Sequence, residues 1–295
     1  MNLSVVVLTF NEEANLARCL ASMVNLGAPL FVVDSGSTDN TRAIARSFGA
    51  LVVEHPFRTH AEQWRWALDN VPLTTNWVLA LDADQALTAE LEDELRSLQP
   101  AAGVSGYFLN RRQVFRGRWI KHGAYYPKYL LKLFDRSKVC FDENDLVDHH
   151  FYVTGETRCL RNDLVEANSK EDDISFWIQK HDRYAALLAE EELRRRKCTA
   201  PSPVRARLFG NPDERSSLLK TWWRRMPPYV RPPLYFVYRY FIRFGWLDGR
   251  QGFVFHFMQA FWFRLMVDLK LEELLAADRA AESRPHPIQP ARGAS

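Results

Sequence analysis

The sequence predicts an α/β fold with a mostly parallel sheet, and three observations lead to this class. Short apolar runs alternate with segments of helical period over the first hundred residues. The same strand, turn and helix design occurs twice before residue 50. The composition, 295 residues with 47% hydrophobic and 25% charged, is that of a globular chain with one large core or two modest ones. Such alternation favours parallel strands with helices on both faces.

Each element of this half has its own pattern. The predicted strands are short apolar runs, at residues 3–10, 30–33, 50–57 and 77–84. The predicted helices repeat apolar residues every three or four positions, at residues 11–24, 39–48 and 60–70. An Asn and two acids open the first helix, and Thr38 or Asp39 can cap the second.

Beyond residue 104 the pattern changes to mixed short segments. The predicted elements are antiparallel strands at 106–115 and 128–135, added to the same sheet, and a long helix at 175–197. Prolines from Pro201 to Pro233 then predict a linker-like stretch. Residues 276–295, rich in Pro, Gly and Ser, are predicted to form a disordered tail.

Charge and cysteine usage narrow the classes of partner. The formal net charge is +3, but residues 193–250 carry 14 Lys or Arg against three acids. This block predicts an anionic partner: nucleic acid, phospholipid headgroups or a phosphorylated glycolipid. The four cysteines lie far apart without a C-x-x-C pair, which disfavours a zinc knuckle or a disulfide framework and favours a reducing cytosol.

Polar clusters follow three of the predicted strands. They are Thr9, Asn11 and Glu12 after the first strand, Asp34 to Asp39 after the second, and Asp82 with Asp84 after the fourth. Because ligands bind at the carboxyl ends of parallel strands, we expect these clusters to meet at one edge. Two adjacent carboxylates raise each other's pKa, and an oxygen-ligated cation, Mg²⁺ or Mn²⁺, would relieve this. The alternative is that either Asp caps a helix starting near Thr88.

Three motifs, VVVLTFNEEANLARCLASM, VVDSGSTDNT and WVLALDADQALT, occur in this order. Together they resemble the family 2 glycosyltransferases, tightly over residues 1–100 and loosely over the rest. The branch most resembled is that of lipopolysaccharide-core and exopolysaccharide assembly, which includes beta-glucosyltransferases. The resemblance implies a GT-A nucleotide-diphospho-sugar transferase fold. It also implies a catalytic domain at 1–200, with a nucleotide-binding half at 1–100 and an acceptor half at 101–200.

The resemblance also implies roles for the polar clusters. The residues expected to line the nucleotide pocket are Thr9, Asn11 and Glu12, and those expected to contact uracil or ribose are Asp34 and Asp39. Asp84 of the D-x-D motif, with Asp82 beside it, is expected to bind Mg²⁺ or Mn²⁺ and the diphosphate of a nucleoside diphosphate sugar.

Two motif positions differ from those of many relatives. Ser35 stands where relatives carry a second Asp, which leaves the nucleotide preference open. The stretch Gln63-Trp64-Arg65 replaces Gln-Arg-Asn or Gln-Lys-Asn. Arg65 can then supply the cation that reaches the diphosphate, or it can be a solvated surface residue.

An inverting transfer needs a base for the acceptor hydroxyl, and the resemblance directs the search to residues 141–156. Asp148 is the first choice, while His149, Glu143 and Asp145 stay open. The run Asp148-His149-His150 could instead be a transition-metal site, but adjacent side chains on a strand point to opposite faces. His181 matches a family helix, with a surface histidine as the alternative.

Residues 232–271 are dense in Tyr, Phe and Trp with interspersed Arg. Every window long enough to span a bilayer contains charges, so residues 201–275 are predicted to lie in the membrane interface. The alternative is that these helices pack back on the catalytic domain. Nucleic acid is the third reading, and no recognised motif supports it.

The expected activity is inverting, metal-dependent transfer from a UDP-hexose to a lipid-linked, lipopolysaccharide or exopolysaccharide acceptor at the cytoplasmic face of the inner membrane. Two rival functions are weighed against it. One is a catalytically silent nucleotide-sugar-binding scaffold of a polysaccharide assembly complex, suggested by Ser35 and by Trp64-Arg65. The other is a nucleotidyltransferase, which the TFNEEAN opening disfavours because it lacks a Gly-rich basic loop.

Overall fold

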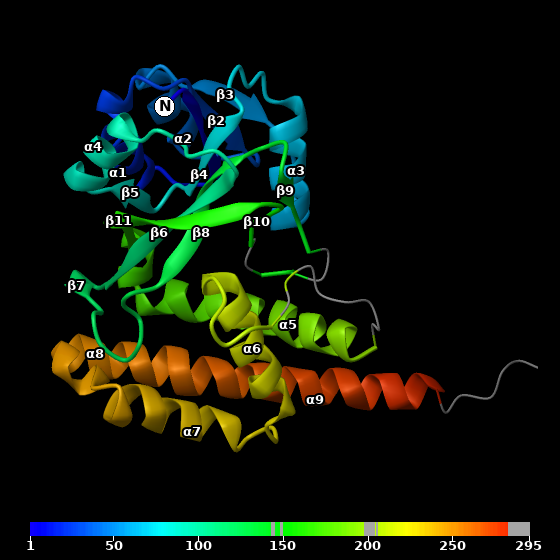
Figure 1. Cartoon of the computed structure of the whole chain (residues 1–295). Helices are drawn as coiled ribbons and strands as arrows, with labels where there is room; N and C mark the ends of the chain where they lie inside the picture. Colours follow the sequence, from blue (N-terminus) through cyan, green and yellow to red (C-terminus); the bar gives the residue numbers. More distant parts are fainter. Residues whose placement is uncertain (143–144, 148–149, 198–203, 205, 283–295) are drawn as a thin grey trace, which may run out of the picture.

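The computed structural model describes residues 1–142, 145–147, 150–197, 204 and 206–282, with residues 281 and 282 as backbone only (Figure 1). Its main sheet has the strand order β3-β2-β1-β4-β8-β6-β11-β5, and β7 pairs with β6. These strands are β1 Leu3–Thr9, β2 Leu30–Asp34, β3 Leu51–Glu54, β4 Trp77–Asp82, β5 Gln85–Leu87, β6 Val104–Phe115, β7 Arg118–Trp119, β8 Tyr129–Asp135 and β11 Glu156–Ala167. A separate antiparallel pair consists of β9 Val139–Cys140 and β10 Tyr152–Val153.

The first four strands in this order run parallel, as the alternating pattern predicts. The helices on their two faces are α1 Leu16–Ala21, α2 Thr41–Ser47, α3 His60–Asn70 and α4 Ala89–Ser97, with the short turn η1 Val24–Leu26. Val5 and Val7 of β1 face the core on the α1 side, whereas Val6 faces the core that contains Trp64 of α3. A strand buried on both faces explains why its sequence is continuously apolar.

The second half of the sheet is mixed. β8 is antiparallel to both β4 and β6, while β11 is parallel to β6 and antiparallel to β5. The predicted antiparallel strands at 106–115 and 128–135 are therefore confirmed, and so is the long helix, α5 Ile174–Lys197. The 3-10 turn η2 Ser169–Asp172 connects β11 to α5. The predicted α/β fold class is confirmed.

The prediction of a linker-like stretch is wrong over residues 212–237, which form α6 Pro212–Arg225 and α7 Arg231–Val237. Asn211 and Glu214 form a reciprocal capping box at the start of α6, and Pro212 occupies its first turn. A proline costs a helix nothing in its first turn, where its missing N–H would have no partner. These prolines therefore begin helices rather than interrupt them.

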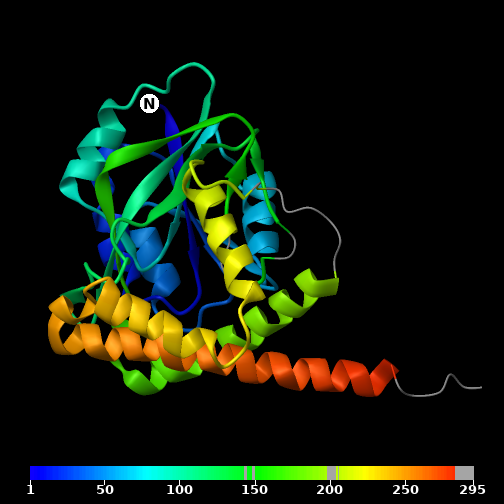
Figure 2. The ribbon, with the colours of Figure 1, turned by 60° about the horizontal axis from the view of Figure 1, so that its bottom comes forward.

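α7 and the elements that follow it form a layer on the far side of α5 from the sheet, whereas α6 lies beside α5 and reaches towards the sheet (Figures 1 and 2). The remaining elements of this layer are η3 Tyr238–Ile242, η4 Gly245–Asp248, α8 Gly249–His256, η5 Phe257–Trp262 and α9 Phe263–Glu282. α9 runs alongside α5 in the same direction (Figure 2). Because α9 continues to Glu282, the tail predicted from residue 276 is wrong over 276–282, and residues 283–295 lie outside the described part.

One side of this layer is packed and the other is exposed. Phe255, Phe263 and Val267 join Trp177 of α5 in a buried cluster, so the alternative that these helices pack on the domain holds for that side. Fully buried Arg231 ties the layer together, because it donates to Glu192 of α5 at 3.0 Å and also to Asp268 of α9. Within the described residues, no helix is both long and apolar enough to cross a bilayer.

Candidate functional site

Asp34 ends β2 and organises the loop that follows it. The carboxylate is fully buried and accepts from the Thr9 hydroxyl at 2.9 Å, from the N–H groups of Gly36 at 3.2 Å and Ser37 at 2.8 Å, and from the Ser37 hydroxyl. Each of its oxygens accepts two hydrogen bonds. Gly36 has a φ of +91°, which a glycine adopts without strain. Asp34 and Thr9 thus fix the backbone of the loop.

Hydrogen bonds join the loops that follow β1 and β2. The N–H of Asn11 donates to the Ser37 hydroxyl at 2.8 Å, and the Asn11 side chain accepts from the N–H of Thr38 at 2.8 Å. The N–H of Glu12 donates to the Thr41 hydroxyl at 2.7 Å. These bonds join residues 9–12 and 34–41 into one polar surface at the carboxyl ends of β1 and β2, where their strands pair in register.

Asp39 completes this surface. Its carboxylate accepts from the N–H of Thr41 at 3.0 Å and from the N–H of Glu13 at 3.2 Å. Partial burial acts to raise the pKa of Asp39, but the hydrogen bonds from Thr41 and Glu13 outweigh it and lower the pKa below its usual value. The carboxylate is therefore ionised at neutral pH.

Asp82 and Asp84 lie at the end of β4, beside Leu8 of β1 in the register. Asp82 accepts from the Lys132 ammonium of β8 at 2.8 Å, and that lysine is buried. Asp84 lies in the turn between β4 and β5, where its carboxylate accepts from the Asn168 side chain at 3.3 Å. The helix-cap alternative is wrong, because Thr88 itself caps α4 by accepting from the N–H of Leu91 at 3.2 Å.

The residues after β11 connect Asp84 to the loop after β1. Asn15 donates to Glu12 at 2.8 Å and to the Asn168 side chain at 3.0 Å, and Asn168 in turn donates to Asp84. The Lys170 ammonium pairs with Glu12 at 2.5 Å. The D-x-D motif and residues 11–12 therefore belong to one hydrogen-bonded edge.

Asp84 is the acid of this edge without an ion pair among the described residues, because Glu12 pairs with Lys170, Asp82 with Lys132 and Glu166 with Arg111. Burial raises the pKa of Asp84 to about 7, and neighbouring Glu166 raises it further, while Lys180 lowers it. Asp82 and Glu12 also act to raise it. A group whose anionic form is penalised in this way gains from a bound cation.

Gln63, Ser35 and His55 form a separate small network at the β2 and β3 ends. Buried Gln63 donates to the Ser35 hydroxyl and to the His55 carbonyl, both at 3.2 Å, and its own carbonyl lies 2.7 Å from His55 Nδ1. Arg65 is exposed, and its guanidinium lies 5.6 Å from the centre of the Phe141 ring. Gln63 thus joins the edge through Ser35, whereas Arg65 lies over Phe141.

The edge also contains residues that sequence reasoning missed: Lys132, Glu166, Asn168, Lys170 and Lys180. Three of them lie at or just after the end of β11. The rule that polar residues at strand ends form sites applies to the run Glu166-Ala167-Asn168, so this signal was available. Lys132 gave no such signal, because it lies within an apolar strand.

Comparison with known proteins settles the family. The family model of glycosyl transferase family 2 matches residues 4–153. The chain belongs to this family. The lipopolysaccharide core biosynthesis glycosyltransferase LpsC of Rhizobium meliloti is 26% identical over 258 residues, which is 85% of each chain. The fold is accordingly the GT-A fold, as the resemblance implied.

Other similarities cover less of the chain. An uncharacterised glycosyltransferase of Rickettsia typhi is 39% identical over 93 residues, and the match covers 32% of this chain and 31% of that protein. The glucosyl-3-phosphoglycerate synthase of Mycobacterium tuberculosis, solved with Mn²⁺, UDP and glucosyl-3-phosphoglycerate, is 26% identical with a TM-score of 0.30, covering 39% of this chain and 44% of that chain.

The residues predicted for the catalytic base of this family 2 glycosyltransferase are Glu143, Asp148 and His149, and all three lie outside the described residues. Asp145 is described, and its carboxylate accepts from Arg195 at 2.5 Å and from the Tyr152 hydroxyl at 3.0 Å. Burial raises the pKa of Asp145 to about 6, while Lys220 acts to lower it.

His181 of the glycosyltransferase is buried on α5. Its ring stacks on Trp177 at 3.5 Å between centroids, and its Nδ1 donates to the Trp177 carbonyl at 2.9 Å. Both contacts lie within the cluster that joins α5 to α9. The surface-histidine alternative is therefore wrong, and the ring packs between helices.

Proposed function

We propose that this family 2 glycosyltransferase is a metal-dependent, inverting enzyme that transfers a sugar from a UDP-hexose to a lipid-linked, lipopolysaccharide or exopolysaccharide acceptor. The observation that carries the proposal is the edge around Asp84, where burial and then neighbouring carboxylates raise the pKa of that residue to about 7. A divalent cation between Asp84 and a diphosphate would neutralise both partners. The loops 9–12 and 34–41 that would hold the nucleotide are bonded to this edge.

The donor set at this edge suits Mg²⁺ or Mn²⁺. Both ions prefer oxygen ligands, and Asp84 offers a carboxylate whose hydrogen bond from Asn168, at 3.3 Å, is long. Among the described residues, no group of three or more His, Cys, Asp or Glu side chains is arranged to hold a metal. We propose Asp84 as the metal ligand and Asp82, which pairs with Lys132 at 2.8 Å, as its neighbour. The ion would stabilise the departing diphosphate.

Residues of the chain would bind the nucleotide and take the proton of the acceptor hydroxyl. Thr9, Asn11, Asp34 and Asp39 shape the loops for the base and ribose, and Lys170 holds Glu12 in this surface. A base on the acceptor side would take the proton of the attacking hydroxyl while the diphosphate leaves on the opposite face of the sugar. Asp148 is proposed for that role, with His149 and Glu143 as the alternatives in the same segment.

Two observations support a membrane-borne acceptor at the cytoplasmic face of the inner membrane. LpsC, a lipopolysaccharide core glycosyltransferase by its name, matches over 85% of this chain. Exposed large apolar side chains also gather in the C-terminal layer, at Leu234, Val237, Tyr238, Phe241, Ile242, Phe244, Trp246, Leu247, Phe253 and Phe257. We call these residues the apolar face. Together with exposed Arg243 and Arg250, the apolar face suits peripheral binding within residues 201–275.

A donor assay tests the proposed activity. The protein is incubated with Mn²⁺ and a panel of labelled nucleotide sugars, and donor hydrolysis and nucleotide binding are measured. We expect UDP-hexose turnover that Asp84→Ala abolishes, while Asp69→Ala, an exposed carboxylate on α3, leaves it unchanged. Saturable UDP binding without transfer to any acceptor extract would instead favour the scaffold function. No binding of any nucleotide sugar would overturn the proposal.

A further inference from the structure

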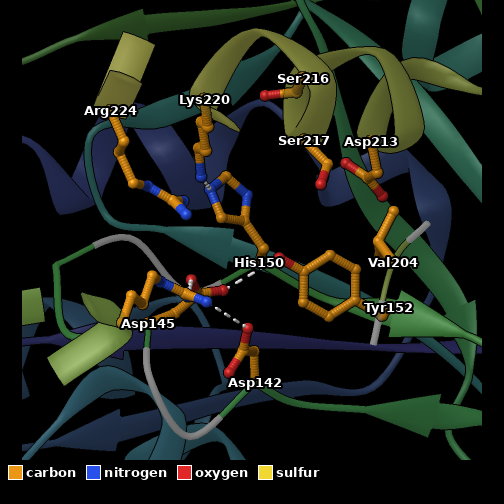
Figure 3. A pocket seen from close by; sticks show the side chains of 11 residues that line it. Asp142, Asp145, His150, Tyr152, Val204, Asp213, Ser216, Ser217, Lys220 and Arg224 are labelled. Atoms are coloured by element: carbon orange, nitrogen blue, oxygen red, sulfur yellow. Dashed lines mark hydrogen bonds and ion pairs between the residues drawn. The ribbon is translucent and has the colours of Figure 1, made fainter. Parts of the chain in front are cut away.

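A second polar hollow lies away from the D-x-D edge, between α6, the end of α5 and the segment around Asp145 (Figure 3). It is open to solvent, and its volume, including the space at the mouth, is about 370 Å³. Arg224 and Lys220, one helical turn apart on α6, project into it towards His150, and Ser217 faces it from the same helix (Figure 3). Two cations and a hydroxyl from one helix face thus line one wall.

Arg224 has no counter-ion within the part of the chain that the structure describes. It forms no hydrogen bond or ion pair there, although it is half-buried. Burial lowers the pKa of Arg224, and the neighbouring Arg195 guanidinium lowers it further. Lys220 donates to His150 Nε2 at 3.1 Å and keeps two further N–H donors. Glu191, Glu192 and Asp145 oppose this lowering from a distance, but none of them forms an ion pair with Arg224. The wall therefore carries a guanidinium and ammonium N–H groups that are not bonded within the described residues.

The acids of the hollow accept from other donors or are partly protonated. Asp142 and Asp145 accept from Arg195 at 3.0 Å and 2.5 Å. Burial raises the pKa of Asp213 to about 7, against the opposing effect of Lys220, so about half of this carboxyl is protonated at neutral pH. Asp142, Asp145 and Glu191 share the one guanidinium of Arg195, so Arg224 and Lys220 also offset these acids. What remains for a ligand is the set of N–H donors of Arg224 and Lys220, which suits phosphate oxygens.

The geometry points to a phosphate-binding subsite formed by Arg224, Lys220 and Ser217, and we propose that it holds a phosphate group of the acceptor. An Arg fork and a Lys ammonium are both established phosphate donors, and a hydroxyl can fill a further oxygen position. This inference rests on the proposed function for the identity of the ligand as acceptor. The assignment of the phosphate donors depends only on the residues that line the hollow.

The position of the hollow separates it from the donor diphosphate. Lys180, which influences the pKa of Asp84, and Arg195, which lines the hollow, lie on the same helix. At the rise of an α-helix these two residues are about 20 Å apart, so the hollow is distinct from the diphosphate position at Asp84. The segment 141–156, which contains the residues proposed for the base, borders the hollow. The phosphate would therefore belong to the acceptor, where binding positions the reacting hydroxyl.

The test uses the full chain saturated with UDP and Mg²⁺, so that the donor site is occupied. Inorganic phosphate is titrated in one arm, and vesicles of phosphatidylcholine with and without phosphatidylglycerol are used in the other. We expect Arg224→Gln to weaken binding of the phosphate probe at least tenfold and Arg224→Lys to weaken it less. Arg225→Gln, an exposed neighbour that removes the same charge, should leave it unchanged.

The two arms identify the source of the phosphate. An Arg224-dependent loss with inorganic phosphate alone indicates a soluble or glycan-borne phosphate, and a loss confined to phosphatidylglycerol vesicles indicates a lipid headgroup. Equal binding by the Arg224→Gln and Arg225→Gln variants in both arms would overturn the subsite. UDP binding is measured in every sample. Because Arg224 lies outside the D-x-D edge, this binding tests the proposed function separately from the subsite.

Discussion

The D-x-D edge and the hollow beside α6 both bring acids and bases together, but they leave groups of opposite charge without an ion pair. At the edge this group is Asp84, and its pKa rises to about 7. In the hollow it is Arg224, and its pKa falls. The comparison teaches that the group left without an ion pair identifies the class of ligand, a cation for the carboxylate and an anion for the guanidinium.

A third cluster provides the balanced case. Arg231 is fully buried between Glu192 and Asp268, and its guanidinium lies 5.2 Å from the centre of the Trp223 ring. Its charge is neutralised by these two carboxylates, so no ligand is expected there. The three clusters therefore predict three different responses to mutation.

The largest effect is expected at Asp84. Asp84→Asn removes the anionic ligand and keeps the shape, so transfer should fall at least about 100-fold, because the cation loses its protein anchor. Steady-state turnover with Mn²⁺ and UDP-hexose measures this. Asp69→Asn is the matched control. Full activity in Asp84→Asn would remove the metal role from the edge.

Removal of the metal should abolish activity as mutation of Asp84 does, and the affinity for the metal should depend on pH. EDTA is expected to abolish transfer, and Mn²⁺ to restore it. Because the pKa of Asp84 in the metal-free protein is about 7, protons compete with the cation below that pH. Apparent Mn²⁺ affinity should therefore fall about tenfold for each pH unit below 7 and level off above it. A flat profile between pH 5 and 8 would contradict the assignment.

Mutation of the cluster of Arg231, Glu192 and Asp268 should affect only the stability of the protein. Arg231→Ala leaves Glu192 and Asp268 as buried, unpaired acids, which costs about 3–5 kcal/mol of unfolding free energy. Urea denaturation measures this cost, and Arg250→Ala, at an exposed site, should change it by less than about 0.5 kcal/mol. A stable Arg231→Ala protein would show that the three helices do not depend on this contact.

The apolar face should have a smaller effect that leaves catalysis intact. The double variant Ile242→Ser and Trp246→Ser removes two exposed apolar side chains and should weaken binding to phosphatidylglycerol vesicles roughly tenfold. Co-sedimentation measures this, and UDP-sugar hydrolysis without vesicles should not change. Leu51→Ser, an exposed apolar residue on β3, is the control. Unchanged co-sedimentation of the double variant would argue against the membrane surface.

The smallest effect concerns Asp213 in the hollow. Its pKa is raised from 3.8 to about 7, so the ionised form is disfavoured in the folded state. Stability from this group is fully present below pH 3.8 and is lost as the pH rises through 7. Asp213→Asn should therefore melt a few degrees, about 2–4 °C, above the wild type at pH 8, and the difference should shrink towards pH 4. A pH-independent difference would contradict this account.

Much of the fold of residues 1–100 could be predicted from the sequence, because the patterns that mark its strands and helices are local. Continuous apolar runs in β1, β2 and β4 mark strands buried on two faces, and the polar residues that follow each run mark their carboxyl ends. Thr9, Asn11 and Asp84 could be predicted in this way. Lys132 could not, because only the insertion of β8 beside β4 places it against Asp82.

Sequence reasoning failed where one residue type has two uses. A proline such as Pro212 predicts a linker, but Asn211 and Glu214 beside it form a capping box, and Pro212 therefore lies at a helix start. The same error concealed the hollow, because Arg224 and Lys220 face one direction only if residues 212–225 are helical. The position of Asn168 between Asn15 and Asp84 likewise depends on long-range pairing of β11 with β6 and β5.

The helix α5 has a consequence for acceptor choice. It is straight and continuous from Ile174 to Lys197, and it carries Lys180 near the D-x-D motif and Arg195 beside the phosphate subsite. One helix therefore borders both proposed sites. It would fix the spacing between a phosphate held in the hollow and the donor bound at the D-x-D motif, so the position of the phosphate on the acceptor would decide which hydroxyl reaches the donor sugar.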